Sequence, residues 1–131
     1  MFKDGKPGKI AYYGEGAPLP TGTVLTVAFT LKGQDFRALN GGPVFKFTEA
    51  VSFMVDCQDQ AEIDYFWDRL VEGGGEHSVC GWLKDRYGVS WPVAPHDTGD
   101  LISGPKRDKV TAVMMTMSRP DLARLEVAAK G

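Results

Sequence analysis

The clearest hydrophobic pattern in the chain lies in its central part. Apolar and polar residues alternate over residues 51–56, which predicts a strand with one buried face. Two further apolar runs, residues 79–83 and 89–93, predict two more strands with a polar turn between them. Pro92 has no amide hydrogen to donate, so we expect the last strand to lie at an edge or to be irregular there.

A helix is predicted between the first two of these strands. Asp59 is followed three residues later by Glu62, which is a variant of the capping box that begins many helices. Glycines 73–75 end the helix, because glycine takes the left-handed cap conformation at little steric cost. Apolar residues recur at helical spacing on one stripe: Ile63, Phe66, Trp67 and Leu70. The central part is therefore one βαβββ module, whose single helix leaves one face of the sheet uncovered.

Three strands are expected before this module and two helices after it. The strands are residues 10–13, 24–31 and 36–40, and the helices are residues 106–117 and 122–129. The three strands resemble the second half of an earlier module that lacks its own first strand and helix. The first of the two helices has a methionine-rich apolar stripe, which we interpret as core or dimer surface rather than a cofactor site.

Composition narrows the possible functions only slightly. A length of 131 residues favours one domain, and the net charge of −2 gives no reason to propose nucleic acid or an anionic membrane as partner. We interpret Cys57 and Cys80 as reduced, buried thiols rather than a disulfide framework. No apolar run is long enough to cross a bilayer and no secretory leader is recognisable, so a cytoplasmic location is expected.

Four segments in order along the chain carry a family resemblance. They are Ala38–Pro43 (ALNGGP), Phe45–Ala50 (FKFTEA), Asp59–Glu62 (DQAE) and Cys80–Gly88 (CGWLKDRYG). The chain resembles the PhnB-like family, often labelled 3-demethylubiquinone-9 3-methyltransferase domain, of the vicinal oxygen chelate (glyoxalase/bleomycin-resistance) superfamily. The resemblance implies an α+β fold in which paired βαβββ modules form a cupped sheet, usually in a homodimer.

We therefore expect a single PhnB-like domain over residues 1–131. It would hold an incomplete first module at residues 1–50, a complete one at residues 51–95 and C-terminal helices at residues 106–131. Family members ordinarily begin with a further strand and helix, so either the gene start is misplaced or the protein functions without them. An incomplete module exposes a sheet edge and an apolar face, which favours pairing with a second copy.

The resemblance also locates the positions where superfamily enzymes hold a metal ion. Their ligands lie on the first and last strands of a module, and these positions correspond to Ser52 and Pro92 here. Neither side chain is a plausible ligand for zinc, nickel or iron, so we predict no metal. A cluster of Glu76, His77 and Cys80 is conceivable, but we interpret His77 as a solvated loop residue without the supporting contacts that orient a ligand.

Other catalytic chemistry finds little support, and no cofactor is predicted. A nucleotide-type cofactor favours a glycine-rich turn between a strand and a helix, whereas glycines 73–75 follow a helix and residues 40–43 do not precede one. Methyltransferase activity therefore lacks a recognisable site. Nucleophilic catalysis by Cys80 would require His77 beside it, and their odd spacing places them on opposite faces of a strand.

What remains is a pocket for a small apolar ligand. By the resemblance, the candidate lining residues are Asn40, Ser52, Met54, Trp82 and Ser90, while Phe53, Val55, Trp67 and Trp91 pack beneath the helix. Our hypothesis is a dimeric, metal-free small-molecule binding protein. The alternatives are a divergent metal-dependent lyase or dioxygenase, a transferase, or a protein whose cup is filled by its own side chains such as Trp82 and Met54. The sequence does not decide whether the chain is an enzyme, and it identifies no catalytic residue.

Overall fold

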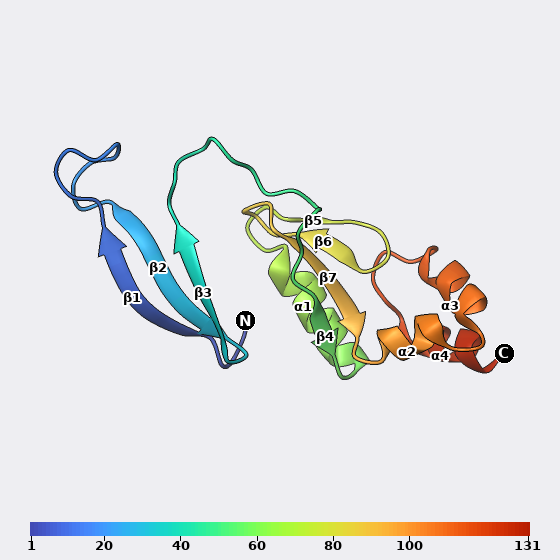
Figure 1. Ribbon diagram of the computed structural model, residues 1–131. Helices are drawn as coiled ribbons and strands as arrows, with labels where there is room; N and C mark the ends of the chain where they lie inside the picture. The colour runs from blue at the N-terminus through green and yellow to red at the C-terminus, as the bar shows by residue number, and fades with distance from the viewer. The chain divides into compact units, whose positions relative to one another are not determined.

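The computed structural model describes all 131 residues, and they form two compact units (Figure 1). The first unit is residues 1–46 and the second is residues 47–131. Each holds one β-sheet, and all four helices belong to the second. The predicted α+β class is therefore confirmed, whereas the assembly of both units into a single domain stays a prediction.

The first unit is a three-stranded antiparallel sheet with the order β1-β2-β3. Its strands are β1 (Lys6–Tyr12), β2 (Val24–Leu31) and β3 (Gln34–Leu39). Lys32 and Gly33 join β2 to β3 with φ angles of 51° and 74°, the left-handed pair that a tight hairpin requires. All three predicted strands are confirmed, although β1 begins four residues earlier than expected.

No side chain of residues 1–46 is buried. Phe29 and Phe36, directly opposite each other on β2 and β3, stack with ring centroids 5.4 Å apart, but both stay partly exposed. A sheet of three strands normally needs one apolar face packed against another layer to be stable. This sheet therefore has no hydrophobic core of its own.

The sheet of the second unit has the order β4-β7-β6-β5. Its strands are β4 (Val55–Cys57), β5 (Glu76–His77), β6 (Trp82–Lys84) and β7 (Ser90–Pro95). The first strand lies parallel to the last, and the other neighbours are antiparallel. With the helix α1 between β4 and β5, this is the predicted βαβββ module.

Two strand boundaries differ from prediction. The first strand is limited to β4, and upstream of it only Ser52 forms a bridge, with Ser90. The strand predicted at residues 79–83 begins only at Trp82, because Cys80 and Gly81 have φ angles of 56° and 79°. Left-handed backbone cannot continue a strand, so these residues turn the chain between β5 and β6.

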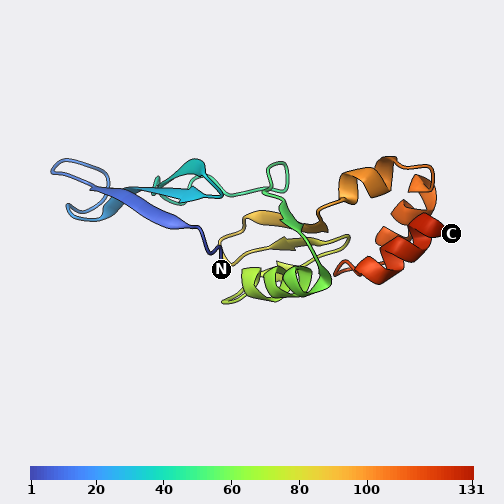
Figure 2. The same ribbon diagram turned by 90° about the horizontal axis from the view of Figure 1, so that it is seen from below.

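Helix α1 (Gln60–Leu70) begins where predicted and has the predicted buried stripe, but it ends before the glycines at residues 73–75. The Asp59 carboxylate accepts a hydrogen bond from the backbone N–H of Glu62 at 2.8 Å, and the Glu62 carboxylate accepts one from the N–H of Gln58 at 2.8 Å. Figure 2 shows α1 lying along one face of the sheet. Leu83 and Val93, both 1% exposed, fill that face. The prediction that the apolar stripe covers one side of the sheet is thus confirmed.

Three short helices follow the module: α2 (Thr98–Ser103), α3 (Arg107–Met114) and α4 (Leu122–Lys130). Their core consists of Val110, Met117 and Leu125. Helix α2 occupies residues expected to be a loop, and α3 ends earlier than residue 117. No side chain caps the beginning of α2 or α3, so the sequence signals that mark α1 are absent there. None of the four helices has the length and apolar character needed to span a membrane.

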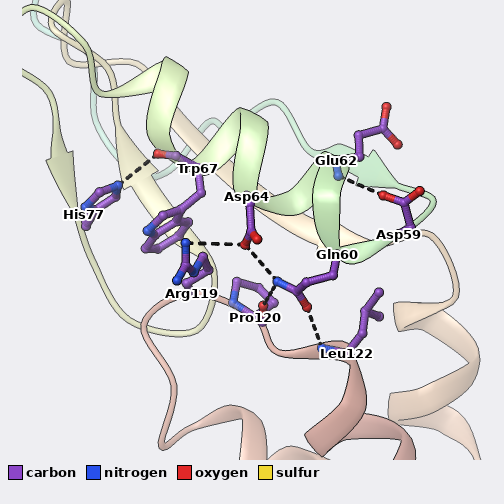
Figure 3. A network of polar contacts seen from close by, with 9 residues as sticks. All are labelled: Asp59, Gln60, Glu62, Asp64, Trp67, His77, Arg119, Pro120 and Leu122. Carbon is purple, nitrogen blue, oxygen red and sulfur yellow. Dashed lines mark hydrogen bonds and ion pairs between the residues drawn. The ribbon is translucent and has the colours of Figure 1, made fainter.

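The amide side chain of Gln60 joins the start of α4 to the start of α1 (Figure 3). Its nitrogen donates to the Asp64 carboxylate at 2.9 Å and to the carbonyl of Pro120 at 3.1 Å, and its oxygen accepts from the N–H of Leu122 at 3.0 Å. Arg119 adds an ion pair with Asp64 at 3.4 Å. The C-terminal helices are therefore fastened to the module.

The capping contact gives a stability prediction. Asp59→Ala removes the acceptor of the Glu62 N–H and should lower the free energy of unfolding by about 1 kcal/mol. Asp68→Ala is the matched control, because Asp68 is exposed on the same helix without a hydrogen bond or ion pair, and it should change stability by less than about 0.5 kcal/mol. Urea unfolding followed by circular dichroism measures both. Equal effects of the two substitutions would contradict the capping role.

Candidate functional site

The face of the second sheet that α1 leaves uncovered carries a polar row. Glu76 pairs with Lys84, Lys84 pairs with Ser90, and Ser90 bridges Ser52 upstream of β4, so these four residues form one row across the sheet. Side chains directly opposite each other share one face of a sheet. Leu83, Trp91 and Val93 of the same strands alternate with these residues and face α1, whereas Trp82 and Pro92 share the uncovered face.

A cavity of about 540 Å³ opens on this face. It is lined by Glu49, Glu76, His77, Ser78, Val79, Cys80, Trp82, Leu83, Lys84, Ser90 and Met115. Six of these residues are polar or charged, but most of the exposed wall area is apolar, and small-molecule sites combine apolar walls with polar anchors. All of the lining belongs to residues 47–131.

Ser90 is the most unusual of these residues. It is 1% exposed, and its hydroxyl has no hydrogen-bond partner. A buried hydroxyl without a partner costs free energy on the order of 1–3 kcal/mol. A ligand or water molecule that bonded to it would recover much of this cost, so Ser90 is a candidate polar anchor.

Two charged residues of the lining form an ion pair. The Lys84 ammonium contacts the Glu49 carboxylate, and both side chains are largely exposed. Hydrogen bonding to Lys84 lowers the pKa of Glu49, and the same bond raises the pKa of Lys84, with a smaller contribution from Glu76. Exposed ion pairs of this kind contribute little to stability, so a ligand can displace Glu49 from Lys84 at little cost.

Two sulfur atoms meet at a third part of the lining. The thiol of Cys80 donates to the thioether sulfur of Met115 at 3.3 Å. Met115 is 64% exposed although it is large and apolar. Both sulfur atoms belong to residues that line the cavity.

The predicted pocket residues divide into three groups. Trp82 and Ser90 line the cavity, whereas Ser52 and Met54 do not, although Ser52 is the bridge partner of Ser90. Asn40 belongs to the first unit, where its side chain donates to the carbonyl of Val24 at 3.1 Å. Ligand binding by any of the five stays a prediction.

Of the residues predicted to lie beneath the helix, two are buried and the other two contact each other. Val55 and Trp67 are 7% and 5% exposed, and the rings of Phe53 and Trp91 lie 5.6 Å apart. The Trp91 indole donates to the Asp85 carboxylate at 3.0 Å, which secures the turn before β7. The predicted turn at residues 85–88 is therefore tied to this layer.

His77 is exposed to solvent, as predicted, but it is not a loop residue. It lies on β5, its ring stacks on Trp67 at 4.4 Å, and its Nε2 is 2.9 Å from the carbonyl oxygen of Trp67 (Figure 3). Since a carbonyl only accepts, Nε2 donates this hydrogen bond. The suggested cluster with Glu76 and Cys80 is not formed: nowhere do three His, Cys, Asp or Glu side chains converge to hold an ion.

Sequence reasoning missed most of the lining. The strand predicted at residues 79–83 stops short of Lys84, yet Lys84 lies on β6 opposite Ser90. Glu49 lies in a segment without regular structure, for which no periodicity exists. Met115 did leave a signal, because it is a large apolar residue outside the predicted stripe of its helix.

Comparison with known proteins identifies the family. The sequence model of the 3-demethylubiquinone-9 3-methyltransferase family matches residues 1–94, which is more than half of the chain. The chain belongs to this family. The PhnB-like resemblance inferred from sequence motifs is thereby confirmed, and the fold is consistent with the vicinal oxygen chelate superfamily.

One solved structure agrees with this assignment. The chain is similar to a putative 3-demethylubiquinone-9 3-methyltransferase, PhnB protein, from Bacillus cereus, with 33% identity, a TM-score of 0.63, and coverage of 72% of this chain and 81% of that one. A protein from Staphylococcus aureus is 27% identical over 72% of this chain and 77% of its own, but its TM-score of 0.30 supports no structural argument. No curated protein matches the chain.

The two cysteines of this PhnB-like chain differ in reactivity. Cys57 is 0% exposed, and burial raises the pKa of its thiol to about 12, with nearby carboxylates adding to the effect. Cys80 is partly exposed on the cavity wall. The prediction that both thiols are buried is thus correct only for Cys57.

This difference predicts selective labelling. At pH 8, iodoacetamide should modify Cys80 alone in the native protein, because Cys57 is inaccessible and forms about a thousandfold less thiolate than a thiol at pKa 9.0. Both cysteines should react in urea. Mass spectrometry of tryptic peptides measures the two rates, and native labelling of Cys57 at a rate similar to that of Cys80 would contradict the assignment.

Proposed function

We propose that this chain is a metal-free, small-molecule binding protein of the PhnB-like family, that it works as a homodimer, and that its ligand occupies the cavity on the uncovered sheet face. The cavity is the main observation that supports this proposal. At about 540 Å³ it falls within the range of small-ligand sites, and its lining is mainly apolar. The ligand class that fits is a compact, largely apolar molecule with one group that can hydrogen-bond.

The lining supplies anchors for such a molecule. The Trp82 ring and the Val79 side chain offer apolar contact, and the unpartnered hydroxyl of Ser90 offers a hydrogen bond. Since an unsatisfied buried hydroxyl is costly, a ligand with a matching group would be favoured over one without it.

The metal-free part of the proposal rests on residue chemistry. The positions that correspond to the superfamily's metal ligands are Ser52 and Pro92. Pro92 pairs with Trp82 and Ser52 with Ser90, so both positions lie on the uncovered face. A proline ring has no donor atom for a metal, and a neutral serine hydroxyl is a poor ligand for zinc, nickel or iron.

We do not extend the methyltransferase label to this chain. Glycines 73–75 follow α1, and Gly41 and Gly42 lead into a segment without a helix. Neither cluster stands between a strand and a helix N-terminus, where a nucleotide-type cofactor is usually held. For location we propose the cytoplasm, which the free thiols of Cys57 and Cys80 favour.

The homodimer is supported by the uncovered first sheet and by charge. Residues 1–46 contain no buried side chain, and they hold six Lys and Arg against three Asp and Glu, a net charge of +3. Residues 47–131 hold nine Lys and Arg against fourteen Asp and Glu, which gives a net charge of −5. Opposite net charges on two parts of one chain favour contact between the basic part of one copy and the acidic part of another.

Closing the cavity tests the binding proposal. Val79→Trp should fill the space beside Trp82 and weaken binding of the apolar dye anilinonaphthalene sulfonate (ANS) at least about tenfold, measured by fluorescence titration. Val127→Trp is the control, since Val127 is similarly exposed on α4 and does not line the cavity. Equal binding by both variants would refute the cavity as the site. Loss of dye binding after treatment with EDTA would refute the metal-free part.

Sedimentation tests the homodimer. The chain of 14.3 kDa should sediment with twice that mass at micromolar concentration. On dilution below the dissociation constant, trypsin should cut residues 1–46 before residues 47–131, because the first sheet loses its cover. A stable monomer in which residues 1–46 resist trypsin would contradict the dimer.

A further inference from the structure

We infer that Cys80 and Met115 form a two-sulfur site for one soft, monovalent cation, and that this cation is Cu(I). The site lies on the wall of the cavity described above, but it does not depend on small-molecule binding there. It also differs from the strand positions Ser52 and Pro92, where superfamily enzymes hold harder metals.

The first support is the direct meeting of two sulfur atoms. The Cys80 thiol points its hydrogen at the Met115 thioether, with the sulfurs 3.3 Å apart and 35 residues apart in sequence. The thiol hydrogen of Cys80 therefore lies between the two sulfur atoms. A cation that replaces this proton would find both donors already facing each other.

The second support is the way the two segments are held together. The N–H of Cys80 donates to the carbonyl of Met117 and the N–H of Gly81 to that of Ser118, both at 2.8 Å. The Ser118 hydroxyl donates to the carbonyl of Ser78 at 2.6 Å. These three bonds fasten the loop that carries one sulfur to the segment that carries the other.

The backbone of Cys80 is unusual in this loop. Its φ of 56° is a left-handed conformation that few residues other than glycine adopt. Such a conformation persists only where surrounding contacts determine it, and it often marks a functional position. Here it sets the thiol beside Met115 rather than along the β6 strand.

The donor chemistry selects the cation. A thiolate and a thioether are soft ligands, and soft ligands favour Cu(I) over magnesium, calcium or manganese. No third His, Cys, Asp or Glu completes a group that would suit four-coordinate zinc.

Binding requires one proton to leave and one side chain to move. The Cys80 thiol gives its proton to solvent, and the resulting thiolate and the Met115 sulfur each form one bond to the cation. The sulfurs must separate beyond 3.3 Å to admit it. Met115 allows this, because its side chain is 64% exposed and unbranched with three rotatable bonds.

Anaerobic competition against a chromogenic Cu(I) chelator tests the inference, with ascorbate present to maintain Cu(I). The protein should bind one equivalent per chain, and Cys80→Ser should abolish binding. Met115→Leu should weaken it at least about tenfold, the lower bound of what losing a supporting partner costs a metal site. Met54→Leu is the matched control, because Met54 is similarly exposed at 60% but lies outside the cavity, and it should bind as the unmodified chain does.

Three outcomes would overturn the inference. They are binding by Met115→Leu equal to that of the unmodified chain, which would indicate ordinary thiol binding; retention of binding by Cys80→Ser; and a loss of binding in Met54→Leu as large as that in Met115→Leu. Circular dichroism verifies that each variant is folded, and ANS titration reports the cavity independently. Normal dye binding without Cu(I) binding would refute this site alone, and the reverse would refute only the small-molecule proposal.

Discussion

The packing of the second unit requires a glycine at position 81. Its φ of 79° is left-handed, and a Cβ atom there would lie 2.6 Å from the carbonyl oxygen of Val93 and 2.9 Å from the Pro120 ring. Because no side chain is present, its N–H reaches the carbonyl of Ser118 and its carbonyl accepts from the N–H of Val93, both at 2.8 Å. One residue thus joins the start of β6, the middle of β7 and the segment before α4, and it fixes where the neighbouring Cys80 points.

The two faces of this sheet have different surroundings. On one face, Leu83 and Val93 pack against α1 and are almost fully buried. On the other, Lys84 and Ser90 are neighbours in the same two strands and line the cavity. Alternation along a strand places successive side chains on opposite faces, so adjacent residues in sequence serve different purposes. Membership of the PhnB-like family is consistent with this arrangement, in which one helix covers only one side.

Local sequence signals predicted the elements that depend on local contacts. The cap at Asp59 located the start of α1 to the residue, and the stripe that includes Trp67 located its buried face, since both follow from the geometry of a single helix. The strand predicted from residue 79 failed because a left-handed conformation at Cys80 is imposed by bonds to residues 117 and 118, which are distant in sequence. Helix α2 was missed because it lacks a side-chain cap.

The cavity could be predicted only in part, for a related physical reason. The family resemblance suggested Trp82 and Ser90, and both line it. The contribution of Lys84 follows from its register opposite Ser90, and that of Met115 follows from where α3 ends. Register and helix packing are properties of the assembled unit, so no periodicity within one segment reveals them.

The lack of buried side chains in residues 1–46 has a consequence for biosynthesis. These residues leave the ribosome before residues 47–131, and domains generally acquire structure in the order of their synthesis. The first sheet has no interior to drive that step, so its strands emerge as an unprotected hairpin array with aromatic side chains such as Phe29 and Phe36 open to solvent. Until another layer covers this sheet, its strand edges and aromatic side chains are exposed, and such exposure makes folding intermediates prone to aggregation.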